Sequence, residues 1–434
     1  MAKVVKLEQA AKDKAAARNG SPRRRGSSQR SALVLGGGGF TGGVYEIGAL
    51  RALDLLAVNR TINDFDIYVG TSAGSMIASL AANGVTPEEM MRVVNQQLPS
   101  SFEEIDLGTL LRPNYRDFAR QAALLPFRML GLGRELMRNL RSVSLMDVGV
   151  ALAENLPAGV YNGSGLERYL RDTLNQLDRS DDFRMLRNEL FLAATDLDTC
   201  ERVILGDEGF EDVPISHAVA ASTALPMVYR PVEVKGRHLI DGGIRSTTNV
   251  DIAVERGARF VIVINPLVPY VNDFQKVIPT ALGSRVRRVS DMGFPQIGYQ
   301  AFKLLAHQRL HEAVSHWERR YPGVDIILIE PDPQDELMFE TNIMNFTKRV
   351  EIARHGFESV TLRLARDYDR FASVCARHGI EISASRVRNV IRHFEREREE
   401  TRAWRRILEQ TTGTLLRQSQ GSRRSPREST TSDA

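Results

Sequence analysis

Cysteine is almost absent from this sequence, because only Cys200 and Cys375 occur among its 434 residues. Two cysteines in a chain of this length do not make a disulfide framework, so the composition favours a reducing compartment. Long apolar runs are also missing, since no stretch reaches the roughly 18 residues that a membrane-spanning helix needs. No apolar segment follows the basic residues near the N-terminus. We therefore expect no Sec signal peptide and a cytoplasmic or peripheral membrane location.

A large excess of charge of one sign is also lacking. The net charge is +4, but residues 1–30 hold nine basic and two acidic residues, which leaves −3 for the rest. A basic arm can bind an anionic membrane or nucleic acid, although many such charge runs are simply solvated. We expect no nucleic-acid partner and keep an anionic membrane surface as a candidate partner. The composition predicts that the arm at 1–30 and the tail at 417–434 are disordered.

What the sequence does contain is an alternation of short apolar strands, glycine-rich turns and helices. A strand at 32–35, a glycine turn at 36–43 and a helix at 44–58 come first. The other predicted strands are 65–69, 190–195, 202–205, 260–264 and 324–329, and the other predicted helices are 75–82, 296–320, 347–378 and 384–410. This order favours a three-layer α/β/α sandwich with a mainly parallel sheet.

The organisation along the chain follows from the same pattern. We predict a catalytic domain at 31–335, with a helical insertion at about 85–180, and a helical C-terminal region at 336–416. Within the insertion, residues 118–141 mix arginines with apolar side chains. Such a stretch suits a membrane surface, a lid or a core helix.

The strongest chemical signal is residues 70–74, which read G-T-S-A-G between a predicted strand and a predicted helix. Gly70 and Gly74 let the chain turn sharply, which exposes the Ser72 hydroxyl above the edge of the sheet. The helix that follows directs its free N–H groups towards developing negative charge. The pattern alone also describes an ordinary Gly-Ser turn, and its position between strand and helix strengthens the nucleophile interpretation.

A second glycine-rich segment, residues 36–43, also lies between a strand and a helix. Its backbone N–H groups can approach an oxyanion closely because no side chains intervene. The same segment fits the dinucleotide pattern G-x-G-x-x-G through Gly37, Gly39 and Gly42. That pattern does not explain a serine elbow shortly afterwards, so we favour the oxyanion loop.

A third segment, residues 238–243, places Asp241 at the end of a predicted strand and before two glycines. Its carboxylate could accept the proton of the serine directly. On its own, an Asp-Gly pair more often only shapes a turn.

Together, the three segments resemble the patatin-like phospholipase family, in which a glycine loop, a G-x-S-x-G elbow and a late D-G-[GA] occur in this order. Residues 221–226 with Pro231, and residues 194–197 more weakly, add to the resemblance, which covers about 32–253 and extends to Pro331 at most.

The resemblance implies a lipid acyl hydrolase that cleaves carboxylic esters of phospholipids or related lipids. Ser72 would be the nucleophile, Asp241 the general base, and the backbone of Gly37, Gly38 and Gly39 the oxyanion hole. Such a Ser–Asp dyad needs no cofactor and no metal.

The sequence departs from the family pattern at two places. The arginine that is common near the end of the glycine loop is replaced by Thr41 or Gly42, depending on the alignment. Asn249 corresponds to the asparagine of the family's Asn-x-Pro, but no proline follows it. The altered loop keeps open an alternative function, a non-catalytic membrane-associated scaffold with the same fold.

A Ser-His-Asp hydrolase is the chemical rival, because His307, His311 and His316 follow Asp241 in the chain. These histidines lie in a charged helical stretch, so we assign them to a solvated helix face. His238 is close to Asp241 in sequence, but strand alternation places the two side chains on opposite faces. We therefore predict no catalytic histidine.

Overall fold

The computed structural model describes most of the chain between residues 30 and 396. The described residues are 30–95, 112–124, 127, 156–176, 178–272, 278–279, 285–335, 337–338 and 348–396. The predicted disordered arm and tail, at 1–30 and 417–434, lie outside the described residues except for Arg30. Most of the basic, apolar stretch at 118–141 lies outside them as well.

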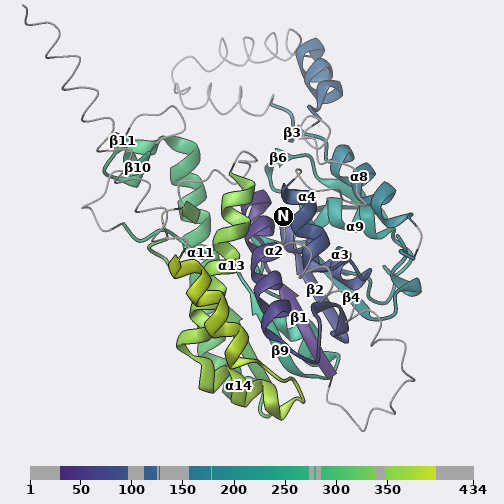
Figure 1. Cartoon of the computed structure of the whole chain (residues 1–434). Helices are drawn as coiled ribbons and strands as arrows, with labels where there is room; N and C mark the ends of the chain where they lie inside the picture. Colours follow the sequence, from purple (N-terminus) through teal and green to yellow (C-terminus); the bar gives the residue numbers. More distant parts are fainter. Residues whose placement is uncertain are drawn as a thin grey trace, which may run out of the picture.

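In the part of the chain that the structure describes, eight strands form one central sheet with the order β12-β9-β1-β2-β4-β8-β7, and β5 also pairs with β4 (Figure 1). The parallel strands are β1 (Arg30–Leu35), β2 (Ile67–Thr71), β4 (Glu189–Asp196), β9 (Ala258–Ile264) and β12 (Asp325–Ile329). The antiparallel strands are β5 (Arg202–Leu205), β7 (Val232–Val234) and β8 (Arg237–Asp241). Two small pairs lie apart, β3 (Gly159–Tyr161) with β6 (Met227–Tyr229) and β10 (Ile278–Pro279) with β11 (Arg285–Val286). The predicted, mainly parallel sheet is confirmed.

Helices cover both faces of this sheet, which confirms the three-layer sandwich. The helices are α2 (Gly39–Leu56), α3 (Ala73–Ala82), α4 (Pro87–Asn95), α8 (Ser164–Leu174), α9 (Ile215–Ser222), α10 (Val250–Glu255), α11 (Phe294–Arg320), α13 (Arg349–Arg366) and α14 (Tyr368–Arg377), and residues 115–124 and 384–396 are also helical. Side chains of β1 alternate between the faces. Leu33 and Leu35 pack in a core with α2, α3, α9 and α13, whereas Ala32 and Val34 pack in a core with α10 and α11.

The helices α2 and α13 lie side by side across one face of the sheet (Figure 1). Two glycines permit this approach. A Cβ atom on Gly48 would lie 2.0 Å from the carbonyl oxygen of Ala353, and one on Gly356 would lie 2.4 Å from that of Tyr45. Any side chain at either position would force the two helices apart, so this pair of glycines fixes how α13 covers α2.

Three predicted elements differ from the structure. The helix expected at 44–58 already begins at Gly39, so the glycine turn is only residues 36–38. The later glycines serve close packing and not a long loop, because Gly42 lies against Pro266. The strand expected at 65–69 is shifted to Ile67–Thr71, and the single helix expected at 347–378 is divided at Asp367 into α13 and α14.

Candidate active site

The glycine turn lies at the carboxyl end of β1. The Gly36 N–H donates to the carbonyl of Ile264 on β9 (2.9 Å), and the Gly36 carbonyl accepts from the Gly74 N–H (3.2 Å). Because α2 begins at Gly39, the first N–H groups of this helix point out of its N-terminal end. Their dipoles and the helix macrodipole favour negative charge at this place. A Cβ on Gly37 would lie 3.2 Å from the Ser72 Cβ, so the loop lies directly beside the serine.

The predicted loop glycines also explain how the turn is held without the family's arginine. A Cβ on Gly38 would lie 2.9 Å from Pro266 Cγ, and one on Gly42 would lie 3.0 Å from the same atom. The first turn of α2 is thus packed against the segment that follows β9. Phe40, next to Thr41, lines the pocket that contains Ser72.

Ser72 occupies a sharp turn between β2 and α3. Its backbone has φ 55° and ψ −128°, a conformation that non-glycine residues rarely adopt. The two flanking glycines are required, because a Cβ on Gly70 would lie 2.5 Å from the Ser75 Cα, and one on Gly74 would lie 2.4 Å from the Gly36 carbonyl oxygen. The structure thus places residues 70–74 in the strand–turn–helix geometry of a nucleophile elbow.

A buried serine holds the elbow in place. The backbone N–H of Ser72 donates to Ser222 Oγ (3.0 Å), and the Ser222 hydroxyl donates to the carbonyl of Ala193 on β4 (2.6 Å). Ser222 belongs to residues 221–226, a segment that resembles the family pattern and for which the sequence alone predicts no role. The structure therefore gives that segment a positioning function.

Asp241 is brought to Ser72 by the register of the sheet. Thr71 of β2 pairs with Ala193, and Asp241 of β8 pairs with the next residue, Ala194, on the same side of β4, because β5 occupies the other side. The Ser72 hydroxyl donates to Asp241 Oδ2 over 2.5 Å, and the other carboxylate oxygen accepts from the Gly243 N–H (2.7 Å). Two residues 169 positions apart thus form one buried contact.

The environment of Asp241 is unusual for a carboxylate. Its side chain is buried, and desolvation raises its pKa from 3.8 to about 6, although the hydrogen bonds from Ser72 and the Gly243 N–H act in the opposite direction. At neutral pH the group is still mainly ionised, but it is a stronger base than an exposed aspartate. A base of this strength, hydrogen-bonded to a serine, fits general base chemistry.

Asn249 connects the elbow to the following helix. Its amide donates to Thr71 Oγ1 (2.9 Å), and its side-chain oxygen accepts from Arg202 (3.0 Å). The residue precedes α10, so it fixes the end of β2, next to Ser72, relative to that helix. The missing proline after Asn249 leaves these contacts intact.

The histidines lie elsewhere. No histidine is among the described residues that line the pocket around Ser72. His238 faces Asp198, and His217 contacts the carbonyl of Glu233 and the carboxylate of Glu167. His307 and His311 lie beside Glu330, a residue that the sequence analysis did not single out. A Ser-His-Asp arrangement is not formed by the described residues, since Asp241 contacts Ser72 directly.

Ser72 and Asp241 line a largely apolar pocket. Its walls come from six helices, α2, α3, α4, α8, α11 and α13, and from the segments near β6 and β9. The apolar lining residues are Phe40, Val44, Ile47, Ala73, Met76, Ile77, Val93, Val94, Leu166, Leu225, Val228, Leu267 and Phe302. A cavity with this lining favours a long hydrocarbon chain over a polar ligand.

Comparison with known proteins agrees with this arrangement. The model of the family "Patatin-like phospholipase" matches residues 33–254, slightly more than half of the chain. The protein therefore belongs to the patatin-like phospholipase family. This membership supports a lipid-hydrolysing activity for the domain that contains Ser72 and Asp241.

Two relatives share this region. "Probable lipid hydrolase 463L" of Invertebrate iridescent virus 6 is 22% identical over 223 residues, which cover 51% of this chain and 63% of the relative. "Uncharacterized protein YqhO" of Bacillus subtilis is 24% identical over 221 residues, which cover 48% and 64%. The matches thus span less than two thirds of the length of either relative.

Among solved structures, VipD from Legionella pneumophila is similar with a TM-score of 0.37 and 16% identity, covering 78% of this chain and 67% of that one. The type III effector protein ExoU has a TM-score of 0.33 and 15% identity, covering 78% and 53%. Likenesses this weak carry no argument about function. No helix among the described residues is both long and apolar enough to cross a membrane.

Proposed function

We propose that this protein hydrolyses carboxylic esters of phospholipids or related acyl lipids, with Ser72 as the nucleophile and Asp241 as the general base. The observation that carries this proposal is the direct 2.5 Å hydrogen bond from the Ser72 hydroxyl to the Asp241 carboxylate, in the lining of an apolar pocket. Membership of the family supports the same substrate class.

The reaction proceeds in two halves. Ser72 Oγ attacks the ester carbonyl carbon while its proton passes to Asp241 Oδ2, and the oxyanion forms beside the N–H groups of Gly37, Gly38 and Gly39. The bond to the alcohol then breaks, and Asp241 returns the proton to the leaving oxygen. In the second half, water gives a proton to Asp241 and attacks the acyl carbon. Ser72 leaves with that proton, and the carboxylic acid is released.

The lining of the pocket supports a fatty acyl chain as the part of the substrate that enters it. Each methylene group moved from water to an apolar site contributes about 0.8 kcal/mol. Met76 and Ile77 on α3 lie within a turn or so of Ser72, and Leu166 on α8 and Phe302 on α11 also line the pocket. An acyl chain that starts at Ser72 would contact these walls.

The proposal also includes contact of the protein with an anionic membrane. Only the beginning of the 118–141 stretch lies within the described residues, and it continues a helical segment that starts at residue 115. Tyr115 and Phe127 are each more than 70% exposed, and Phe118 is exposed as well. Aromatic side chains next to arginines are typical of a segment at a membrane interface. The triple variant Tyr115→Ser, Phe118→Ser, Phe127→Ser should bind anionic vesicles more weakly, and unchanged binding would remove this part.

The main test combines activity with covalent labelling. Wild type, Ser72→Ala and Asp241→Asn are assayed on nitrophenyl esters and on mixed phospholipid vesicles, and each is treated with an alkyl fluorophosphonate, which phosphonylates an activated serine. Asp198→Asn is the matched control, since Asp198 is exposed and forms an ion pair with His238.

We expect hydrolysis and labelling in the wild type and in Asp198→Asn, and neither in Ser72→Ala. Asp241→Asn should lose both, with unchanged circular dichroism. A wild type that neither hydrolyses any ester nor reacts with the phosphonate, although it binds vesicles, would favour the non-catalytic scaffold. Labelling that persists in Ser72→Ala would exclude the named nucleophile.

A further inference from the structure

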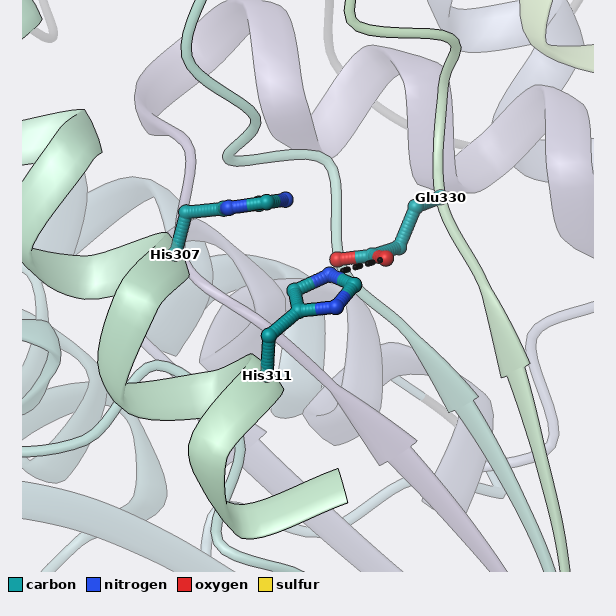
Figure 2. Close-up of side chains that lie close together, drawn as sticks. All are labelled: His307, His311 and Glu330. Carbon is teal, nitrogen blue, oxygen red and sulfur yellow. Dashed lines mark hydrogen bonds and ion pairs between the residues drawn. The ribbon is translucent and has the colours of Figure 1, made fainter. Parts of the chain in front are cut away.

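A second group of side chains with metal-binding atoms lies at the edge of the sheet that also carries the active site, two strands away from β1. His307 and His311 are one turn apart on α11, with ring centroids 4.1 Å apart. Both project from that helix towards Glu330, which directly follows β12 (Figure 2). One ligand atom from each of the three residues lies within 4.8 Å of the others.

A hydrogen bond from a neighbouring side chain holds the carboxylate of Glu330 in place. Its side chain is only 8% exposed, and Oε1 accepts a hydrogen bond from Asn265 Nδ2 over 2.8 Å. Its second oxygen, Oε2, lies 3.0 Å from His311 Nε2. Arg363 donates to the backbone carbonyl of Glu330 (2.8 Å) and not to its carboxylate. One carboxylate oxygen therefore remains directed at the histidines.

Two histidines and one carboxylate are a donor set that zinc uses with a fourth, open position. Histidines at positions i and i+4 present their rings on one face of a helix, as in known zinc helices. The exposed edge of His311 would leave room for a water molecule as the fourth ligand. Magnesium and calcium prefer oxygen ligands throughout, so the two imidazoles argue against them.

From this arrangement we infer that His307, His311 and Glu330 form a binding site for a zinc-class divalent transition metal ion. Asn265 is the outer-shell partner that orients the carboxylate, as such partners do in known metal sites. The ion would fasten α11 to the end of β12. Since Phe302 on α11 lines the active-site pocket, the ion would also stabilise one wall of that pocket.

The protonation state of His307 suits this role. Burial, followed by the nearby His311, lowers the pKa of His307 below its usual value, although Glu330 acts in the opposite direction. A neutral imidazole is the form that binds a metal, so less proton release is needed at neutral pH. The alternative to a metal site is an ion pair between His311 and Glu330, which would require no metal.

The test uses the full-length protein without a polyhistidine tag, carrying Cys200→Ser to remove an exposed thiol that could itself bind zinc. After treatment with a chelator, the protein is titrated with Zn²⁺ by calorimetry, and Co²⁺ is added separately to record the visible spectrum of a tetrahedral site. His307→Gln and His311→Gln are the test variants. His316→Gln, on the same helix but bonded to the carbonyl of Glu312, is the matched control.

We expect one zinc ion per chain and a rise in Tm on binding. Loss of an outer-shell partner weakens metal binding by about 10–100-fold, so Asn265→Ala should fall in that range and each histidine variant should lose at least about 100-fold. The control should bind as the parent does. Absence of stoichiometric zinc binding in the parent, or equal binding in the parent and both histidine variants, would overturn the site.

Discussion

Replacing Asp241 by Asn should remove activity and at the same time stabilise the protein. Burial raises the pKa of this carboxyl from 3.8 to about 6. A tenfold change in an ionisation equilibrium is about 1.4 kcal/mol. Keeping the ionised carboxylate buried therefore costs the folded state about 3 kcal/mol at pH values well above 6. An asparagine has nearly the same shape, can accept from the Gly243 N–H, and carries no charge.

The sign of the effect follows from linkage. Because the folded-state pKa is raised, the stabilisation by the protonated form is complete below about pH 4 and is lost as the pH rises through about 6. The stability difference between Asp241→Asn and wild type should thus be about 3 kcal/mol at pH 8, about half of that at pH 5, and close to zero below pH 4. For a chain of this size, 3 kcal/mol corresponds to about 3 °C in Tm.

The assay is thermal unfolding of both proteins between pH 4 and pH 8, with ester hydrolysis measured in parallel. Asp198→Asn should show no such pH-dependent gain, since the Asp198 side chain is 74% exposed. If Asp241→Asn is equally or less stable than wild type at pH 8, the carboxylate is not strained by burial, and the reasoning about a tuned base fails.

Four further predictions concern activity and packing. The kcat/KM of the wild type should rise with pH through about 6 and then level off, because Asp241 must be ionised to accept the proton of Ser72; a profile that is flat between pH 5 and pH 8 would contradict this. For esters that differ only in acyl length, kcat/KM should rise about fourfold per methylene until the pocket is filled, and equal rates for short and long chains would exclude an acyl site there. Gly48→Val should lower the free energy of unfolding by about 3 kcal/mol, because the new side chain would push α2 away from α13. Gly298→Ala, where nothing lies near a new Cβ, should instead raise it by up to about 1 kcal/mol in denaturant titrations.

Much of the fold could be predicted because its signals are local. The apolar strands, the elbow at 70–74 and the turn after Asp241 each depend on a few consecutive residues, whose conformations follow from glycine geometry and apolar periodicity. The start of α2 was predicted wrongly for the same reason. A glycine run favours a turn locally, but packing against Pro266 makes Gly39 the first helical residue.

The sequence by itself thus determined the fold class, the family and the candidate nucleophile. Only the tertiary structure decided which distant groups meet. The pairing of β2 and β8 with successive residues on one side of β4 brings Asp241 to Ser72, and burial in the folded protein raises the pKa of Asp241. The same holds for His307, His311 and Glu330, which in the sequence are two helix residues and one residue after a strand. Contacts between residues far apart in the chain depend on how the layers pack, and no local pattern of side chains specifies that.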